Sequence, residues 1–226
     1  MLDHIRIGEG KEILFLHGWG CTKEIFNLSY SPSFCLTAPD LYGFGGTPAP
    51  PFGVDLDYYV RGVRQLLEHY HMEDVTIVAH SFGARIALRL AQDSRISGLV
   101  LIGAAGLRPR RKPIYYLRVL HAKLARLFAL SGPKGSKDYS TLSPVMKRTF
   151  INIVHTYQDR ELQLVRCPVL LIWGEEDRET PLYMLRKFEH GLPHSNTVML
   201  EGCGHFCFLE QSSRVHQLIK EFVRNL

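Results

Sequence analysis

Apolar positions along this chain follow two alternating periods. Short, nearly continuous apolar runs are typical of strands that are buried on both faces of a sheet. Between them, apolar residues recur every three or four positions, as on one side of an amphipathic helix. The helix predicted over residues 59–70 carries Arg61, Arg64 and Glu68 on its opposite side. The predicted strands are 13–17, 34–38, 75–79, 99–102, 169–173 and 197–200, and further helices are predicted at 85–91 and 215–223.

This alternation of strands and helices predicts an α/β fold with a mostly parallel central sheet and helices on both faces. The connections between its parallel strands should be right-handed crossovers. A chain of 226 residues with 46% hydrophobic and 22% charged residues fits a single globular core. Functional sites in such folds collect at the carboxyl ends of the strands, so chemistry should be sought in the loops that follow them.

Residues 107–166 break the alternation. Helical patterns at 115–130 and 145–156 flank a loop at 131–136 that is rich in glycine, serine and lysine. We therefore predict a helical insertion in a core made of residues 1–106 and 167–226. The insertion holds 13 Lys and Arg against 3 Asp and Glu, a net charge of +10, whereas the rest of the chain has a net charge of −5.

Several classes of protein and site are disfavoured. The longest apolar stretch, 99–107, contains glycines and is shorter than the roughly 18 residues that cross a bilayer. The N-terminus lacks a signal-peptide pattern, so the expected compartment is the cytoplasm. The 5 cysteines are scattered and odd in number, which favours reduced thiols. Cys203, His205 and Cys207 lie close together, but no second ligand pair accompanies them, so we expect no metal and no cofactor.

Ser81 is the candidate nucleophile. It lies directly between a predicted strand and a predicted helix, where a sharp turn strains the backbone and exposes the serine Oγ. The usual motif is G-x-S-x-G, and Ala79 occupies the position of its first glycine. A serine that only caps the following helix is the alternative interpretation. The surrounding sequence is Val78-Ala79-His80-Ser81-Phe82-Gly83.

Asp177 and His205 supply the rest of a nucleophilic set. Asp177 follows the strand at 169–173, and His205 follows the strand at 197–200. A serine hydroxyl is a poor nucleophile until a base removes its proton and a third group orients that base. The order Ser, Asp, His is the one expected on this type of sheet. We predict His205 as general base and Asp177 as its orienting acid, with Glu175 and Glu176 as alternative acids.

These motifs resemble the α/β-hydrolase family over most of the chain. The resemblance rests on His17-Gly18-Trp19-Gly20, on Pro39-Asp40-Leu41-Tyr42-Gly43-Phe44-Gly45, and on the turn at Ser81. It implies that the backbone N–H groups of Trp19 and Phe82 form an oxyanion hole. It also implies that an insertion after the sixth strand, here 107–166, forms a lid.

Three polar residues near these motifs have alternative roles. His17 and His80 are rival bases, but both flank other parts of the expected site, whereas His205 lies on a loop that faces the nucleophile. We expect His17 to hydrogen-bond nearby backbone as a structural residue. Asp40 should stabilise the turn in which it lies.

The resemblance extends to pimeloyl-[acyl-carrier protein] methyl ester esterases, which share the His-Gly-Trp-Gly motif and a basic lid. It implies hydrolysis of a carboxylic ester, with an acyl carrier protein or a coenzyme A thioester steered by the lid. A solvated basic face is the alternative interpretation of the lid charge. The same triad also suits a thioester, a lactone or a carbon–carbon bond, and a slow-turnover ligand receptor is a further alternative. No nucleic-acid-binding motif accompanies the basic residues.

Overall fold

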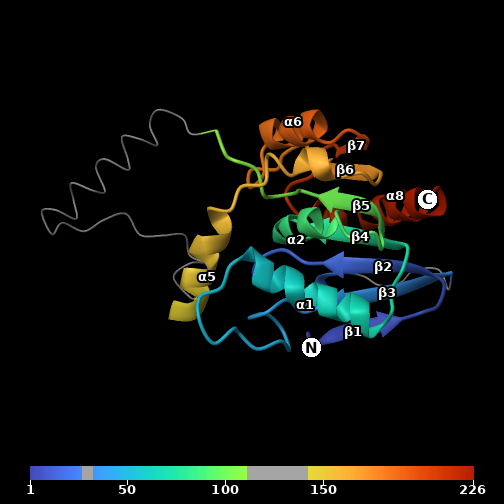
Figure 1. Ribbon diagram of the computed structural model, residues 1–226. Helices are drawn as coiled ribbons and strands as arrows, with labels where there is room; N and C mark the ends of the chain where they lie inside the picture. The colour runs from blue at the N-terminus through green and yellow to red at the C-terminus, as the bar shows by residue number, and fades with distance from the viewer. Residues whose placement is uncertain (27–32, 111–141) are drawn as a thin grey trace, which may run out of the picture.

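The strands build one sheet around which the protein is organised. The computed structural model describes residues 1–26, 33–110 and 142–226. Within these ranges the sheet order is β1-β3-β2-β4-β5-β6-β7 (Figure 1). Neighbouring strands are parallel except β1, which is antiparallel to β3. The strands are β1 His4–Ile7, β2 Lys11–Leu16, β3 Phe34–Pro39, β4 Val75–His80, β5 Ile96–Ile102, β6 Val169–Gly174 and β7 Ser195–Leu200. The predicted α/β class and the mostly parallel sheet are confirmed.

The two edges of the sheet differ from the sequence-based expectation. The sequence pattern did not predict β1, which has four residues and no buried one. The pattern did predict β7, but as a strand buried on both faces, and this was wrong. Only Leu200 of β7 is buried, and Met199 is 43% exposed. An edge strand has one neighbour and less cover, so apolar composition alone does not report its burial.

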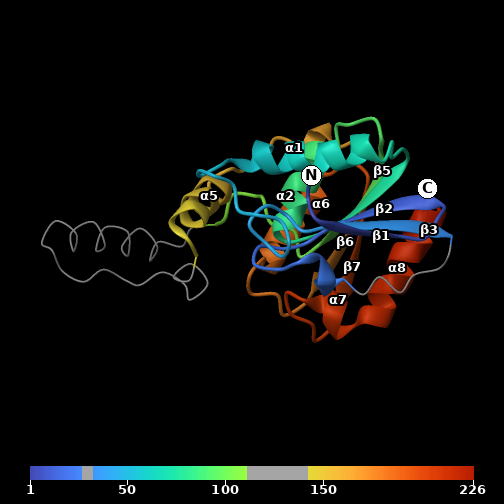
Figure 2. The same ribbon diagram turned by 90° about the horizontal axis from the view of Figure 1, so that it is seen from below.

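Helices cover both faces of the sheet, as Figure 2 shows edge-on. On one face lie α1 (Leu56–His69), α2 (Phe82–Leu90) and α6 (Leu182–Gly191), while α7 (Cys207–Glu210) and α8 (Ser212–Arg224) lie on the other. Because side chains alternate along a strand, each central strand contributes to two cores. In β2, Leu14 and Leu16 pack in the core beneath α1 and α2, whereas Ile13 and Phe15 pack in the core beneath α8.

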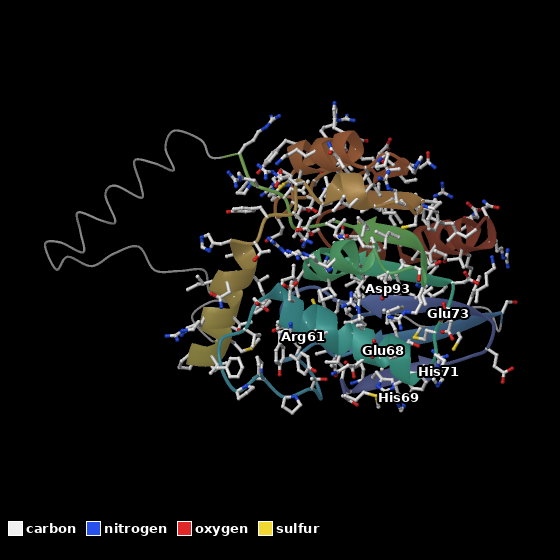
Figure 3. All side chains as sticks on the ribbon, in the orientation of Figure 1. Arg61, Glu68, His69, His71, Glu73 and Asp93 are labelled. Carbon is white, nitrogen blue, oxygen red and sulfur yellow. The ribbon has the colours of Figure 1, made fainter. Side chains whose placement is uncertain are left out.

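Helix α1 illustrates why these segments are helical. The Asp55 side chain caps its N-terminus by accepting a hydrogen bond from Tyr58 N at 3.1 Å. Its apolar side is buried, whereas Arg61 and Glu68 are exposed on the outer side (Figure 3). The structure thus confirms the predicted amphipathic helix. Helix α6 was not predicted, although it buries Met184, Leu185 and Phe188.

The insertion follows β5, the fifth strand of this chain. Its described part contains α5 (Pro144–Val154) and the short 3-10 helix η2 (Leu162–Leu164). Helix α5 confirms the helix predicted at 145–156, and it begins with a Ser143 cap and a proline at its first turn. It lies beyond the ends at which the parallel strands finish (Figure 1). The helix predicted at 115–130 and the loop at 131–136 lie outside the described residues. No helix in the described ranges is long and apolar enough to cross a membrane.

Candidate active site

Ser81 lies on a sharp turn between β4 and α2. Its backbone has φ 49° and ψ −106°, a conformation that costs a non-glycine residue free energy. A Cβ on Gly83 would lie 2.2 Å from the Leu16 carbonyl oxygen, so this position of the motif needs glycine. Ala79, at the other small position, is fully buried in the core. Its methyl group therefore fits where the usual motif has glycine.

The backbone of Ser81 is held while its hydroxyl is left available. Ser81 N donates to the Ile102 carbonyl at 3.0 Å, and Ala105 N donates to the Ser81 carbonyl at 3.2 Å. The Ser81 side chain makes no helix-capping hydrogen bond. This observation argues against the interpretation of Ser81 as a helix cap.

Asp177 and His205 are brought together by the loops after β6 and β7. His205 Nδ1 lies 2.8 Å from Asp177 Oδ2, and the carboxylate is fully buried. Asp177 also accepts hydrogen bonds from the backbone of Glu179 and from both the backbone and the hydroxyl of Thr180, at 2.7–2.9 Å. Burial alone would raise the pKa of Asp177, but the hydrogen bonds from His205 and Thr180 outweigh it and lower that pKa. The carboxylate is therefore ionised at neutral pH.

Backbone contacts between the two loops fix this pair. Glu175 N donates to the Leu200 carbonyl at 3.0 Å, and Glu176 N donates to the Cys203 carbonyl at 2.8 Å. Gly174 permits the approach, because a Cβ there would lie 2.4 Å or less from the Cys203 and Gly204 carbonyl oxygens. Both alternative acids, Glu175 and Glu176, are exposed, and it is Asp177 that contacts His205.

Two backbone N–H groups next to Ser81 have no acceptor among the described residues. They belong to Trp19, in the loop after β2, and to Phe82, at the first position of α2, where helical N–H groups lack partners. The Trp19 ring makes edge contacts with Phe82 and with Phe150 of α5. The side chain thus lines the site while its N–H stays available.

Ser81, His205, Trp19 and Phe82 all line one cavity, whose volume is about 400 Å³. Ser81 and His205 both line it, but no hydrogen bond links their side chains. Catalytic hydrogen bonds are often long in an unliganded enzyme and shorten when substrate binds. The other lining residues are Gly18, Trp19, Cys21, His80, Phe82, Arg85, Ala105, Leu142, Phe150, Ile153, Val154, Glu179 and Phe206.

Comparison with known proteins identifies the family to which the chain belongs. A family model described as "Alpha/beta hydrolase family" matches residues 13–218. The chain belongs to the α/β-hydrolase family. It is 25% identical to the AB hydrolase superfamily protein YisY of Bacillus subtilis, over 96% of this chain and 92% of that protein. It is 22% identical to the 2-hydroxy-6-oxo-2,4-heptadienoate hydrolase of Pseudomonas putida, over 96% of this chain and 90% of that protein.

Solved structures of hydrolases share the fold of this one. An esterase from Exiguobacterium antarcticum superposes with a TM-score of 0.79 at 19% identity, over 98% of this chain and 94% of that one. A meta-cleavage product hydrolase from Pseudomonas fluorescens IP01 gives a TM-score of 0.76 at 24% identity, over 99% of this chain and 94% of that one. These likenesses show a shared fold, and it is the match to the α/β-hydrolase family that makes the protein an enzyme of the hydrolase type.

The rings of His17 and His80 form hydrogen bonds with backbone atoms near the site of this hydrolase. His17 Nε2 accepts from Leu41 N at 2.9 Å, and its Nδ1 lies 2.8 Å from the Gly18 carbonyl oxygen, in agreement with the expected structural role. His80 Nε2 lies 3.0 Å from the His205 carbonyl oxygen. Burial, together with the charge of a protonated His205, lowers the pKa of His80 to about 3, so its ring is neutral. His80 therefore supports the loop of His205 and is not a competing base.

The remaining sequence expectations concern Asp40 and the cysteines. Asp40 accepts hydrogen bonds from Lys23 N at 2.7 Å and from Gly46 N at 2.8 Å, so it stabilises the turn as expected. All five cysteines are free thiols, and Cys203 and Cys207 are buried. In the parts of the chain that the structure describes, no group of three or more His, Cys, Asp or Glu is arranged to hold a metal ion.

Gly103 is a site residue that the sequence pattern did not single out. It follows β5 with φ +49°, and a Cβ there would lie 3.1 Å from His205 Nδ1 and 3.2 Å from Asp177 Oδ2. Glycine therefore gives the Asp177–His205 pair the space it needs. The available signal was a glycine directly after a predicted strand, at the sheet edge where sites collect.

Proposed function

We propose that this hydrolase cleaves a carboxylic ester through Ser81, His205 and Asp177 by way of an acyl-enzyme. The hydrogen bond between His205 and Asp177, at the wall of the cavity that Ser81 lines, carries the proposal. The strained turn at Ser81 and the two available N–H groups support it. Together these features match the parts that acyl transfer needs: nucleophile, base, orienting acid and oxyanion donors.

The mechanism follows from the roles of these groups. Ser81 Oγ attacks the ester carbonyl carbon while its proton moves to His205 Nε2. The N–H groups of Trp19 and Phe82 stabilise the oxyanion. The intermediate then collapses, the carbon–oxygen bond to the alcohol breaks, and the alcohol takes the proton from His205. A water molecule then attacks the carbonyl carbon of the acyl-enzyme while its proton moves to His205 Nε2. The bond from that carbon to Ser81 Oγ breaks, Oγ takes the proton back from His205, and the carboxylic acid is released. Asp177 accepts the hydrogen bond from His205 Nδ1–H throughout.

Labelling with a fluorophosphonate probe tests the proposal, followed by assays with p-nitrophenyl esters of increasing acyl length. We expect one probe per chain on Ser81 and turnover of at least one ester. Absence of labelling in the wild-type protein would refute Ser81 as nucleophile. Labelling without ester turnover would refute the esterase assignment and favour a slow-turnover receptor or hydrolysis of a different bond.

Hydrolysis of a carbon–carbon bond is the second candidate. A relative aligned over 96% of this chain is named 2-hydroxy-6-oxo-2,4-heptadienoate hydrolase. The same nucleophile, base and oxyanion donors serve a ketone carbonyl whose leaving group is a stabilised carbanion. Turnover of that dienoate, with no turnover of any p-nitrophenyl ester, would favour this candidate over ester hydrolysis.

The basic insertion motivates a narrower hypothesis about the natural ester. Its net charge of +10 suits an anionic acyl carrier protein, so we propose a carrier-linked methyl ester as one substrate to test. Salt screens attraction between exposed charges. We therefore expect KM for a carrier-linked ester to rise with salt, while KM for a free methyl ester stays constant. An equal salt response of both substrates would contradict a role for the lid charge.

A further inference from the structure

Arg85 lies in the wall of the cavity, one helical turn from the nucleophile. It follows Ser81 by four residues, which places both on the same side of α2. Side chains of helical residues lean toward the N-terminus of their helix, which for α2 is the end at Ser81. Arg85 is only 8% exposed, and it lines the same cavity as Ser81 and His205.

The hydrogen bonds of Arg85 leave one edge of its guanidinium available. Nη1 donates to the Ile153 carbonyl at 3.1 Å and to the Thr156 carbonyl at 2.6 Å, at the C-terminal end of α5. These two bonds use both hydrogens of Nη1. The Nε–H and Nη2–H groups have no partner among the described residues. They form the side of the guanidinium fork that matches a carboxylate bidentately.

The charge of Arg85 has no counter-ion among the described residues. Glu179 lines the same cavity but forms no ion pair with it. Arg89, on the next turn of α2, shows the usual arrangement and pairs with Asp57 and Glu161. Burial lowers the pKa of Arg85 to about 10, so it stays protonated at neutral pH. A buried cation without a counter-ion is costly, and an anionic ligand would remove that cost.

We infer that Arg85 determines specificity for the acyl group by binding a carboxylate through its Nε–H and Nη2–H edge. This inference rests on the proposed ester hydrolysis. It names the substrate class as half-esters of short dicarboxylic acids, in which one carboxyl is esterified and the other is free. A carrier-linked methyl ester has no free carboxylate, so Arg85 would not contribute to the binding of that substrate.

A purely structural role for Arg85 makes a different prediction. If it only holds the carbonyls at the end of α5, its replacement should affect acidic and neutral substrates equally. If it binds carboxylate, its replacement should remove a preference between them. The ratio of kcat/KM for two substrates of equal shape therefore separates the two roles.

The test compares p-nitrophenyl hydrogen glutarate with the p-nitrophenyl ester of glutaric acid monoamide, which has the same shape without the charge. We expect the wild-type enzyme to prefer the acid in kcat/KM by on the order of 10- to 100-fold, the range for a hydrogen-bonded charge. In Arg85→Gln the ratio should fall to about one, because kcat/KM for the acid falls much further than kcat/KM for the amide ester. The matched control Arg89→Gln should keep the wild-type ratio.

Three other outcomes of this test would overturn the inference about Arg85. A wild-type ratio of one, or a proportional loss of both activities in Arg85→Gln, would overturn the inference. Arg85→Lys keeps the charge but lacks the fork, so it should lose most of the preference, and it replaces Arg85→Gln if that variant fails to fold. Retention of the full preference in Arg85→Lys would also overturn the inference.

Failure of the proposed function itself is distinguishable. If the wild-type protein takes no fluorophosphonate and hydrolyses neither ester, ester hydrolysis is refuted. Calorimetric titration with glutarate then tests Arg85 alone. Binding that is lost in Arg85→Gln supports the carboxylate site, and absence of binding to the wild-type protein refutes it.

Discussion

Ser81→Ala should lower kcat for p-nitrophenyl esters by on the order of 10⁶, the loss typical of a nucleophile that acts as one unit with its base. Alanine removes the oxygen that is proposed to form the acyl-enzyme, while His205, Asp177 and the two N–H groups remain. KM should change little, because the hydroxyl contributes to bond formation rather than to binding. Steady-state rates and loss of fluorophosphonate labelling measure the effect.

Ser213→Ala is a matched control for this substitution. Ser213 is exposed on α8, outside the cavity, so its replacement should leave both turnover and labelling unchanged. Equal thermal unfolding of the two variants would show that the loss in Ser81→Ala is chemical. Turnover of Ser81→Ala within tenfold of the wild-type rate would disprove the role of Ser81.

Asp177→Asn should lower kcat by roughly 10⁴. The amide carbonyl can still accept from the backbone of Glu179 and Thr180, so the loop should keep its shape. However, the amide NH₂ would face His205 Nδ1, which favours the wrong imidazole tautomer. The negative charge that stabilises the imidazolium is also lost. Rates measured across pH, with unfolding measured in parallel, test this expectation.

Glu176→Gln is the control for Asp177→Asn. Glu176 is the preceding residue, and its side chain is exposed while its backbone N–H bonds Cys203. Its replacement should leave kcat near the wild-type value. If Glu176→Gln lowered kcat as much as Asp177→Asn, the acid would have been assigned to the wrong residue.

The central strands and the order of the site motifs could be predicted from the sequence because both depend on local patterns. Val75–His80 and Val169–Gly174 are nearly continuous in apolar residues and are buried on both faces. The edges were less predictable. His4–Ile7 has no apolar run, and the exposure of Ser195–Leu200 depends on which strand becomes its neighbour, which is a property of the whole sheet.

The site shows the same division between local and long-range information. The sequence pattern predicts that Asp177 and His205 each follow a strand, and in the structure a hydrogen bond connects their side chains. The closeness of Gly103 to that pair could not be predicted from the sequence, because it depends on how three separate loops come together. The sequence pattern predicts Arg85 only as the first residue of a helix. Its place in the cavity wall could not be predicted, because the carbonyls to which it donates lie about 70 residues later. The carrier-protein partner stays a prediction, since much of the basic segment lies outside the described residues.

The position of β7 at the edge of the sheet has a consequence for how long the enzyme can work. His205 follows a strand that has one neighbour and a single buried residue. Local opening of such an edge requires less free energy than unfolding of the central strands. The proposed base therefore separates from Ser81 whenever this edge opens, even while the rest of the sheet stays folded. We therefore expect activity to be lost before the sheet as a whole unfolds, so that residual activity on heating should fall ahead of global unfolding.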